Sequence, residues 1–197
     1  MSTAAARDPI AQFKTWWDAA KTDSPLRQKS AVCISTVDPD GYPSGRFVDL
    51  KAVSEEGFTF CTHLDSAKGQ HLARDPKIAL AAWWDHVGYQ VRVVGEAAPI
   101  DDAEAEAFWN TRTRHARLTT VAFRQSEPLG SEDELAARVE ALDRELGDAE
   151  IPKPSHWGGY RIRPHSIEFL TFRESRLHLR ELFQKHDGIW TRTLLQP

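Results

Sequence analysis

Basic and hydroxyl side chains that could bind an anion are grouped in a few short stretches of the sequence. They are Arg46 and Lys51 in one predicted strand, Thr62, Ser66 and Lys68 around a strand-to-helix turn, and Arg112, Arg114 and Arg117 in one short segment. Hydroxyl groups, the N–H groups of a helix start and Lys or Arg side chains are typical donors of a phosphate site. The alternative is an ordinary solvated surface, which the same composition also fits.

The spacing of Arg46 and Lys51 limits how they can act together. The two residues are five positions apart, so an unbroken strand would point their side chains to opposite faces, roughly 16 Å from each other. Both can contact one ligand only if the ligand is long, or if the strand bends or bulges.

Two more polar stretches lie in the second half of the chain. Gln125 and Ser126 could contact a ligand from a loop, or they could simply end a helix. In a strand, the run Arg-Leu-His-Leu-Arg at 176–180 would place Arg176, His178 and Arg180 on one face. A basic wall with a histidine that exchanges protons near neutral pH suits an anionic or phenolic substrate, although a solvent-facing surface fits equally well.

Several other catalytic classes lack their signatures. The sequence contains neither G-x-G-x-x-G nor G-x-x-x-x-G-K-[ST], so a nucleotide-like cofactor would need another kind of binding site. The eight His and two Cys residues show no spacing typical of metal ligands, and we expect no metal site. The G-x-S-x-G elbow of many serine hydrolases is also absent.

The charge and hydropathy of the sequence limit the classes of binding partner and indicate a cellular location. A formal net charge of −4 argues against broad affinity for nucleic acid or for an anionic membrane. No secretion signal is recognisable, and no apolar run approaches the length that spans a bilayer, so we expect a cytoplasmic protein. Cys33 and Cys61 lie in apolar, strand-like runs and are expected to be small buried side chains.

Hydrophobic periodicity predicts many short strands with helices around them. After a tail at 1–7 that we expect to be disordered, a single domain at 8–197 begins with a helix at Asp8-Pro9. The predicted strands are 31–37, 44–53, 58–62, 78–84, 89–100, 160–163, 167–172, 182–185 and 189–194, and the other helices are near 66–75, 101–112, 115–124 and 131–146, the last with a capping box at Ser131. The strands do not alternate with helices, which favours an α+β, mainly β fold: an antiparallel barrel with peripheral helices.

Seven short motifs are weak singly but specific in their order and spacing. They are DPIAQF at 8–13, SGRFVDLK at 44–51, SAKG at 66–69, YQVRVVG at 89–95, RQS at 124–126, HWGGY at 156–160 and RLHLR at 176–180. In this order the chain resembles the pyridoxine/pyridoxamine 5′-phosphate oxidase family, from about Asp8 to Pro197. The resemblance implies a split β-barrel homodimer with two FMN molecules at the subunit interface.

The resemblance also implies roles for individual residues. The FMN contacts would be Arg46, Lys51, Thr62, Lys68, Gln90, Gln125, Ser126 and Arg180, and the substrate would face Lys51, Arg112, Arg176 and His178, with Arg176 and His178 as catalytic residues. A site between two chains would also answer the strand-face problem. The implied reaction oxidises pyridoxamine or pyridoxine 5′-phosphate to pyridoxal 5′-phosphate, with FMN taking a hydride and O₂ being reduced to H₂O₂.

The chain departs from the family pattern at five positions. Ala67 stands where an arginine beside the FMN phosphate is usual, Leu170 where a tryptophan lies near the flavin, and Cys61 where tyrosine is common. Phe108 and Ala116 replace a tyrosine and a serine that hydrogen-bond the substrate phosphate. Each lost hydrogen bond costs on the order of 1 kcal/mol, so we expect weakened recognition of the substrate phosphate. We expect FMN binding to be retained.

These observations support three functions in descending order. The first is an FMN-dependent oxidase of pyridoxamine or pyridoxine 5′-phosphate. The second is a divergent FMN oxidase of another small aromatic compound, as in phenazine biosynthesis, which the reduced phosphate-binding set favours. The third is a non-catalytic flavin-binding split barrel, against which the retained Arg176 and His178 argue.

Overall fold

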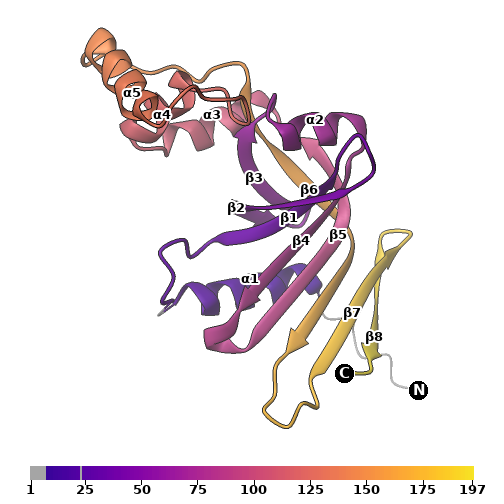
Figure 1. The fold of residues 1–197 in the computed structure, drawn as a ribbon. Helices are drawn as coiled ribbons and strands as arrows, with labels where there is room; N and C mark the ends of the chain where they lie inside the picture. Colours follow the sequence, from indigo (N-terminus) through magenta and orange to yellow (C-terminus); the bar gives the residue numbers. More distant parts are fainter. Residues whose placement is uncertain (1–7, 23) are drawn as a thin grey trace.

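The polypeptide forms one antiparallel sheet that closes on itself, with helices on the outside (Figure 1). The computed structural model describes residues 8–22 and 24–197, so the tail predicted at 1–7 lies outside the described residues. The strands are β1 (Ala31–Val37), β2 (Pro43–Ser54), β3 (Gly57–His63), β4 (Lys77–Trp84), β5 (Tyr89–Pro99), β6 (Trp157–Thr171), β7 (Leu179–His186) and β8 (Ile189–Leu195). The helices are α1 (Pro9–Lys21), α2 (Ala67–Arg74), α3 (Asp102–Asn110), α4 (Arg114–Ala122) and α5 (Asp133–Leu146), with a 3₁₀ turn η1 at Asp85–Val87.

The strand order confirms the predicted α+β, mainly β class and the antiparallel split barrel. The sheet runs β3-β2-β1-β4-β5-β6-β7-β8, and an additional pairing of β3 with β6 closes the first six strands into a barrel. The long strand β6 makes this possible, because its first half pairs with β3 and its second half pairs with β7. Strands β7 and β8 therefore extend from the barrel as a flap (Figure 1).

Helix α1 packs its apolar side against the interior of the barrel. Asp8 caps the helix by accepting a hydrogen bond from the Ile10 N–H at 2.9 Å, and Pro9 occupies the first turn, as the sequence predicts. The fully buried Phe13 ring lies 4.7 Å from Phe58 and 5.6 Å from Trp84, centroid to centroid. These edge-on contacts fasten α1 to β3 and β4.

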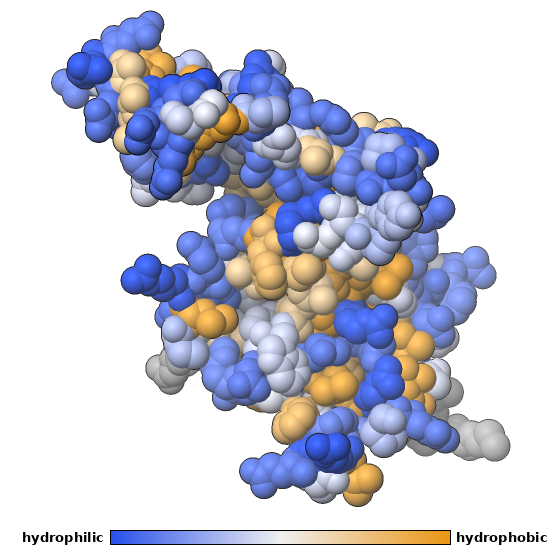
Figure 2. All heavy atoms as spheres, viewed as in Figure 1, coloured by the Kyte–Doolittle hydropathy of each residue, from blue (hydrophilic) through white to orange (hydrophobic). Residues whose placement is uncertain are grey.

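Helices α3, α4 and α5 form a separate lobe beside one end of the barrel (Figure 1). A second hydrophobic cluster joins the lobe to β6 through Trp109 and Trp157, whose rings are 5.0 Å apart, with Leu118 and Ile151. The surface of the lobe is largely hydrophilic (Figure 2). No helix in the described ranges is both long and apolar enough to cross a membrane.

Two local predictions are wrong. The two strands predicted at 160–163 and 167–172 are the single strand β6, which continues past Pro164 through a bulge where Gly95 of β5 lets the backbones approach. The capping box predicted at Ser131 does not form, since α5 begins at Asp133 and no side chain caps it. The Glu134 carboxylate instead pairs with Arg138 one turn along the helix.

Candidate active site

A pocket of about 730 Å³ opens between the barrel and the helical lobe, where Figure 2 shows the surface hollowed. Its walls come from β2, β3, the start of α2, the turn between α3 and α4, helix α4 with the segment after it, and single residues of α5 and β6. Six of the residues predicted to bind cofactor or substrate line it: Arg46, Thr62, Lys68, Arg112, Gln125 and Ser126. The structure therefore brings together side chains that are up to 80 positions apart in the sequence.

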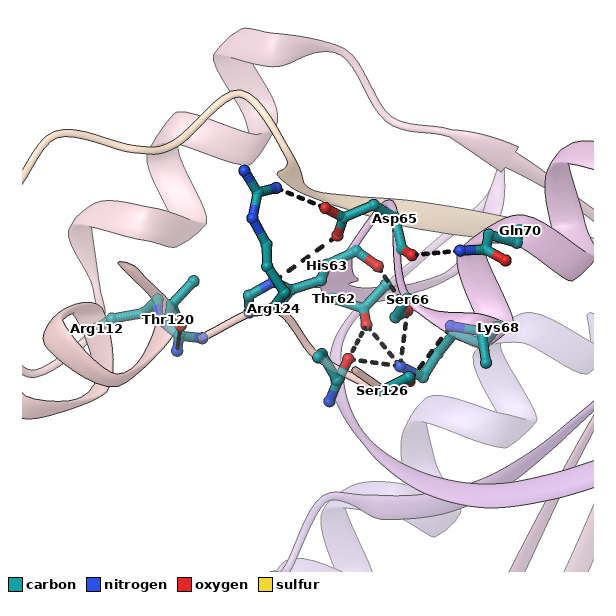
Figure 3. A network of polar contacts seen from close by, with 12 residues as sticks. Thr62, His63, Asp65, Ser66, Lys68, Gln70, Arg112, Thr120, Arg124 and Ser126 are labelled. Atoms are coloured by element: carbon teal, nitrogen blue, oxygen red, sulfur yellow. Dashed lines mark hydrogen bonds and ion pairs between the residues drawn. The ribbon is translucent and has the colours of Figure 1, made fainter. Parts of the chain in front are cut away.

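The Lys68 ammonium lies at the centre of a polar network in this pocket (Figure 3). Lys68 is only 6% exposed, and its Nζ donates to Gln125 Oε1 at 2.6 Å, to Thr62 Oγ1 at 2.9 Å and to Ser66 Oγ at 3.1 Å. All of these acceptors are uncharged. The network holds a buried cation without neutralising it, which is the arrangement expected of an anion site.

The turn between β3 and α2 places these groups. Ser66 precedes the helix but does not cap it, because its hydroxyl donates to the His63 carbonyl at 2.7 Å. The Ala67 N–H donates to Ser126 Oγ at 3.3 Å instead, and Ser126 has a left-handed backbone with φ +79°. A Cβ at Gly69 would lie 1.9 Å from the Leu64 carbonyl oxygen, so only glycine permits this tight approach.

Arg46 is the second cation of the pocket. Its guanidinium donates to Thr36 Oγ1 at 2.7 Å and to Ser44 Oγ at 2.8 Å, and the Thr36 hydroxyl is 2.9 Å from His71 Nδ1. Among the described residues no carboxylate pairs with Arg46 or Lys68. We call Arg46, Thr62, Lys68, Gln125 and Ser126 together the Lys68 pocket.

The pKa values of the two cations reflect this missing countercharge. Burial, and next the charge of Arg46, lower the pKa of Lys68 to about 8. Burial likewise lowers the pKa of Arg46 from its ordinary value. A bound dianion would reverse both effects, so the pocket is electrostatically better suited to an occupied state than to an empty one.

Arg112 occupies the opposite end of the same pocket. Its guanidinium carbon lies 5.1 Å from the Trp157 ring and 5.5 Å from the Trp109 ring, and burial lowers its pKa. Cys61 lines the pocket nearby, and its burial raises the pKa of the thiol to about 12, so the thiol is neutral at physiological pH. Arg112 is thus the charged group at this end.

Lys51 lies near the pocket but does not line it. The pairing of β2 with β3 shifts register between Leu50 and Ala52, so Lys51 lies at a bulge, one of the two conditions on which the sequence allowed it to serve the same ligand as Arg46. Its ammonium is 2.6 Å from the carboxylate of Asp49, which does line the pocket.

Gln90 and Arg180 lie on a different surface from the pocket. Gln90 of β5 pairs with Leu170 of β6, and Leu170 pairs with Arg180 of β7, so the three form one row across the sheet. Arg180 donates to the buried Glu168 carboxylate at 2.6 and 2.9 Å. We call this row, with Arg176 and His178 of the adjoining loop, the β5–β7 face.

The prediction that residues 176–180 form a strand with three polar side chains on one face is wrong for the first half of that run. Strand β7 begins at Leu179, and Arg176 has a left-handed backbone with φ +63° inside the loop that joins β6 to β7. The His178 ring stacks on Phe172 with centroids 4.7 Å apart, and its Nδ1 accepts the Arg173 N–H at 3.1 Å. The loop folds back on itself, which an alternating pattern could not reveal.

Sequence reasoning missed some pocket residues. His63 is 8% exposed and lines the pocket, its ring lies 5.2 Å from that of His156, and burial followed by the nearby His156 lowers its pKa to about 4. Thr120 is 5% exposed and accepts a hydrogen bond from Arg112. The signal for His63 was its position directly after Thr62 at the end of a strand; for Thr120 there was only its place one helical turn after Ala116.

Comparisons with known proteins identify a family for this chain. Residues 19–144 match the family described as pyridoxamine 5′-phosphate oxidase, and 157–197 match the pyridoxine 5′-phosphate oxidase C-terminal dimerisation region. Among curated relatives, the pyridoxine/pyridoxamine 5′-phosphate oxidase of Acaryochloris marina is 39% identical over 100% of this chain and 90% of that protein. The enzyme of the same name from Caulobacter vibrioides is 42% identical over 96% of this chain and 85% of its own length.

Two solved structures share the fold of this chain. PhzG from Burkholderia lata 383, in complex with tetrahydrophenazine-1-carboxylic acid, superimposes with a TM-score of 0.89 at 30% identity, covering 96% of this chain and 93% of that chain. A pyridoxamine 5′-phosphate oxidase-related, FMN-binding protein from Nostoc punctiforme shares the fold with a TM-score of 0.77 at 18% identity, over 98% of this chain and 100% of that chain. The chain belongs to the pyridoxamine 5′-phosphate oxidase family.

Proposed function

We propose that this chain is an FMN-dependent oxidase that converts pyridoxamine or pyridoxine 5′-phosphate into pyridoxal 5′-phosphate, with O₂ reduced to H₂O₂. The observation that carries the proposal is the Lys68 pocket, in which two buried or half-buried cations contact hydroxyl and amide groups but no carboxylate. Relatives that bear this enzyme's name are about 40% identical over nearly the whole chain.

The donor set of the Lys68 pocket fits the phosphate of FMN. Lys68 and Arg46 supply positive charge, and Thr62 and Ser126 supply hydroxyl groups beside the first turn of α2. The Ala67 N–H at that turn points to Ser126, so this short polar loop and the helix start lie together. The arginine that the family usually has at position 67 is absent, and Arg46 remains as the second cation.

The β5–β7 face would supply the remaining FMN contacts through Gln90 and Arg180. These residues do not line the pocket of their own chain, so we propose a homodimer in which the face of one copy covers the Lys68 pocket of the other. The match of 157–197 to a dimerisation region supports this, as do large exposed apolar side chains such as Phe47 (75%), Leu177 (66%) and Phe172 (50%). Each copy would contribute residues 8–197 as one split-barrel domain.

The substrate would lie between Arg112 and Lys51 at one end and Arg176 and His178 at the other. Arg112 offers positive charge to the phosphate of the substrate. Because His178 Nδ1 accepts the Arg173 N–H, a neutral His178 carries its proton on Nε2. That proton is available for a hydrogen bond to the ring oxygen of the substrate, while Arg176 orients the reacting end.

These positions separate the role of the cofactor from the roles of the protein side chains. Bound FMN would supply the redox chemistry, namely the uptake of a hydride equivalent from the substrate and the transfer of its electrons to O₂. The protein would bind the two phosphates in separate basic sites and fix the orientation of the substrate ring, with the Trp157 and Trp109 rings packed beside the Arg112 guanidinium. No protein side chain needs to act as a nucleophile.

The test is oxidation by FMN-loaded protein, with H₂O₂ measured by a peroxidase-coupled assay and pyridoxal 5′-phosphate by its absorbance. The proposal predicts equal amounts of both products from pyridoxamine 5′-phosphate. The match to PhzG and the changes at Phe108 and Ala116 favour one second candidate, oxidation of a tricyclic aromatic acid. Turnover of tetrahydrophenazine-1-carboxylic acid alone would select that candidate, and flavin binding without reduction by either compound would contradict both.

A further inference from the structure

The side chain of Arg112 is held from one side only. Its Nη2 donates to the Thr120 hydroxyl at 2.8 Å and to the Ala116 carbonyl at 2.9 Å. Within the described residues Nη1 makes no hydrogen bond, and Nε is buried without a partner. The Trp157 and Trp109 rings, whose centroids are 5.0 Å apart, lie next to each other, 5.1 and 5.5 Å from the guanidinium carbon. The Nη2 end of the guanidinium is therefore fixed, and the N–H groups of Nη1 remain for a ligand; Figure 3 shows Arg112 beside Thr120.

The Thr120 hydroxyl is itself locked in place. Thr120 is 5% exposed, and its Oγ1 donates to the Ala116 carbonyl at 2.9 Å while it accepts from Arg112. Residues 116 and 120 lie on one face of α4, one helical turn apart. The hydroxyl therefore has its donor and an acceptor position already used, and its orientation is determined by the helix backbone.

The position of this hydroxyl matters because the resemblance assigns a serine hydroxyl to position 116 and a tyrosine hydroxyl to position 108. Both are missing here, where Ala116 and Phe108 stand. A site with fewer direct donors depends more on the donors that remain being held in the binding geometry before the ligand arrives. A flexible arginine loses affinity by being ordered on binding, and an arginine already ordered does not.

We propose that Thr120 is a positioning residue that fixes Arg112 in the conformation that binds the anionic end of the substrate. Thr120 does not touch the substrate in this account; it acts through Arg112. This inference rests on the proposed function for the identity of the substrate, but the ordering of Arg112 by Thr120 does not depend on it.

The first experiment compares Thr120→Val, Thr120→Ser and Thr119→Val in the FMN-loaded enzyme with pyridoxamine 5′-phosphate. Thr120→Val keeps the shape and removes the hydroxyl, so KM should rise about fivefold to twentyfold while kcat and the Kd for FMN stay within twofold. Thr120→Ser should restore KM. Thr119→Val is the matched control, because that neighbouring hydroxyl donates to the His115 carbonyl and not to Arg112.

A double-mutant cycle tests whether Thr120 acts through Arg112. In an Arg112→Met background, Thr120→Val should leave KM unchanged, since the side chain at 112 then has no donor for the hydroxyl. A further rise in KM equal to that in the wild-type background would overturn the proposal, as would a KM for Thr120→Val within twofold of wild type. A Thr120→Ser variant that behaves like Thr120→Val would overturn it as well.

A second readout needs no turnover. In ¹⁵N NMR spectra the Arg112 Nε–H signal, assigned by its loss in Arg112→Lys, should report greater side-chain mobility in Thr120→Val but not in Thr119→Val or Thr120→Ser. If the enzyme fails to oxidise pyridoxamine 5′-phosphate, the proposed function fails, and this measurement still decides the role of Thr120. Equal Arg112 mobility in all variants would overturn it.

Discussion

The Lys68 pocket and the β5–β7 face differ in how complete they are within one chain. In the pocket the Lys68 ammonium is buried and joined to three neutral acceptors, so the geometry exists before any ligand binds. On the face Arg180 is already paired with Glu168, and Arg176 lies exposed in a loop. A single chain therefore builds the anion-binding half of a site and leaves the other half open, as expected if a second copy completes it.

The largest expected effect comes from removing the cation of the Lys68 pocket. Lys68→Met should weaken FMN binding by about 100-fold, because the phosphate loses a buried charge-assisted hydrogen bond. The FMN-free protein should gain a few degrees in Tm, since the folded state lowers the pKa of Lys68 to about 8 and so disfavours its charged form at pH 7. Flavin fluorescence quenching and calorimetry measure the two effects.

Lys77→Met serves as the control for that variant, because the Lys77 side chain is 75% exposed and pairs only with Asp75. It should change neither the FMN affinity nor Tm. If Lys68→Met bound FMN with wild-type affinity, the Lys68 pocket would not be the phosphate-binding region that distinguishes it from the β5–β7 face.

A change at Arg176, in the loop part of the β5–β7 face, should affect turnover and spare the cofactor. Arg176→Ala should lower kcat about tenfold or more with the FMN Kd within twofold, because Arg176 is assigned to the substrate end. Arg173→Ala is the matched control from the same exposed loop, since only the backbone N–H of Arg173 contacts His178. Loss of flavin from Arg176→Ala would mean that the loop belongs to the phosphate site instead.

The affinity for FMN should depend on pH with a sign set by Lys68. The free protein has a Lys68 pKa of about 8, and the FMN phosphate raises it, so binding is strongest below pH 8 and weakens above it. The Kd should rise about tenfold between pH 7 and pH 9 and be flat over this range in Lys68→Met. A flat profile in the wild-type protein would contradict the assignment of Lys68 to the phosphate.

The smallest effect concerns Leu170, which lies between Gln90 and Arg180 in the row on the β5–β7 face. Leu170→Trp should tighten FMN binding by about twofold to fivefold, because an aromatic ring adds a stacking surface for the flavin. Isothermal titration measures the change. Weaker binding would show that the row does not face the flavin.

The sequence predicts those features that depend on neighbouring residues. Strand β1 follows from its β-branched run, helix α1 from Asp8 and Pro9, and the grouping of Thr62 with Lys68 from their places around one strand-to-helix turn. The strand pattern also predicts an antiparallel barrel, but it does not identify β3 and β6 as the pair of strands that closes it.

Features that depend on distant residues could not be predicted. The continuity of β6 past Pro164 depends on Gly95 of a neighbouring strand, and the bulge at Lys51 depends on the register of β2 with β3. The left-handed backbone of Arg176 follows from the folding of its loop, whose side chains Phe172 and His178 stack. At Lys51 and Arg176 the local pattern is that of a regular strand, whereas at Pro164 it indicates a break that the structure does not have.

Complementation between two inactive chains tests the central claim most directly. Heterodimers of a Lys68→Met chain and an Arg176→Ala chain, purified through two different tags, would contain one site with both residues intact and one with neither, if each site combines the pocket of one copy with the face of the other. We predict about one FMN and about half the wild-type turnover per heterodimer. No recovery above the two parental homodimers would show that both regions serve the same chain's site, contrary to this account.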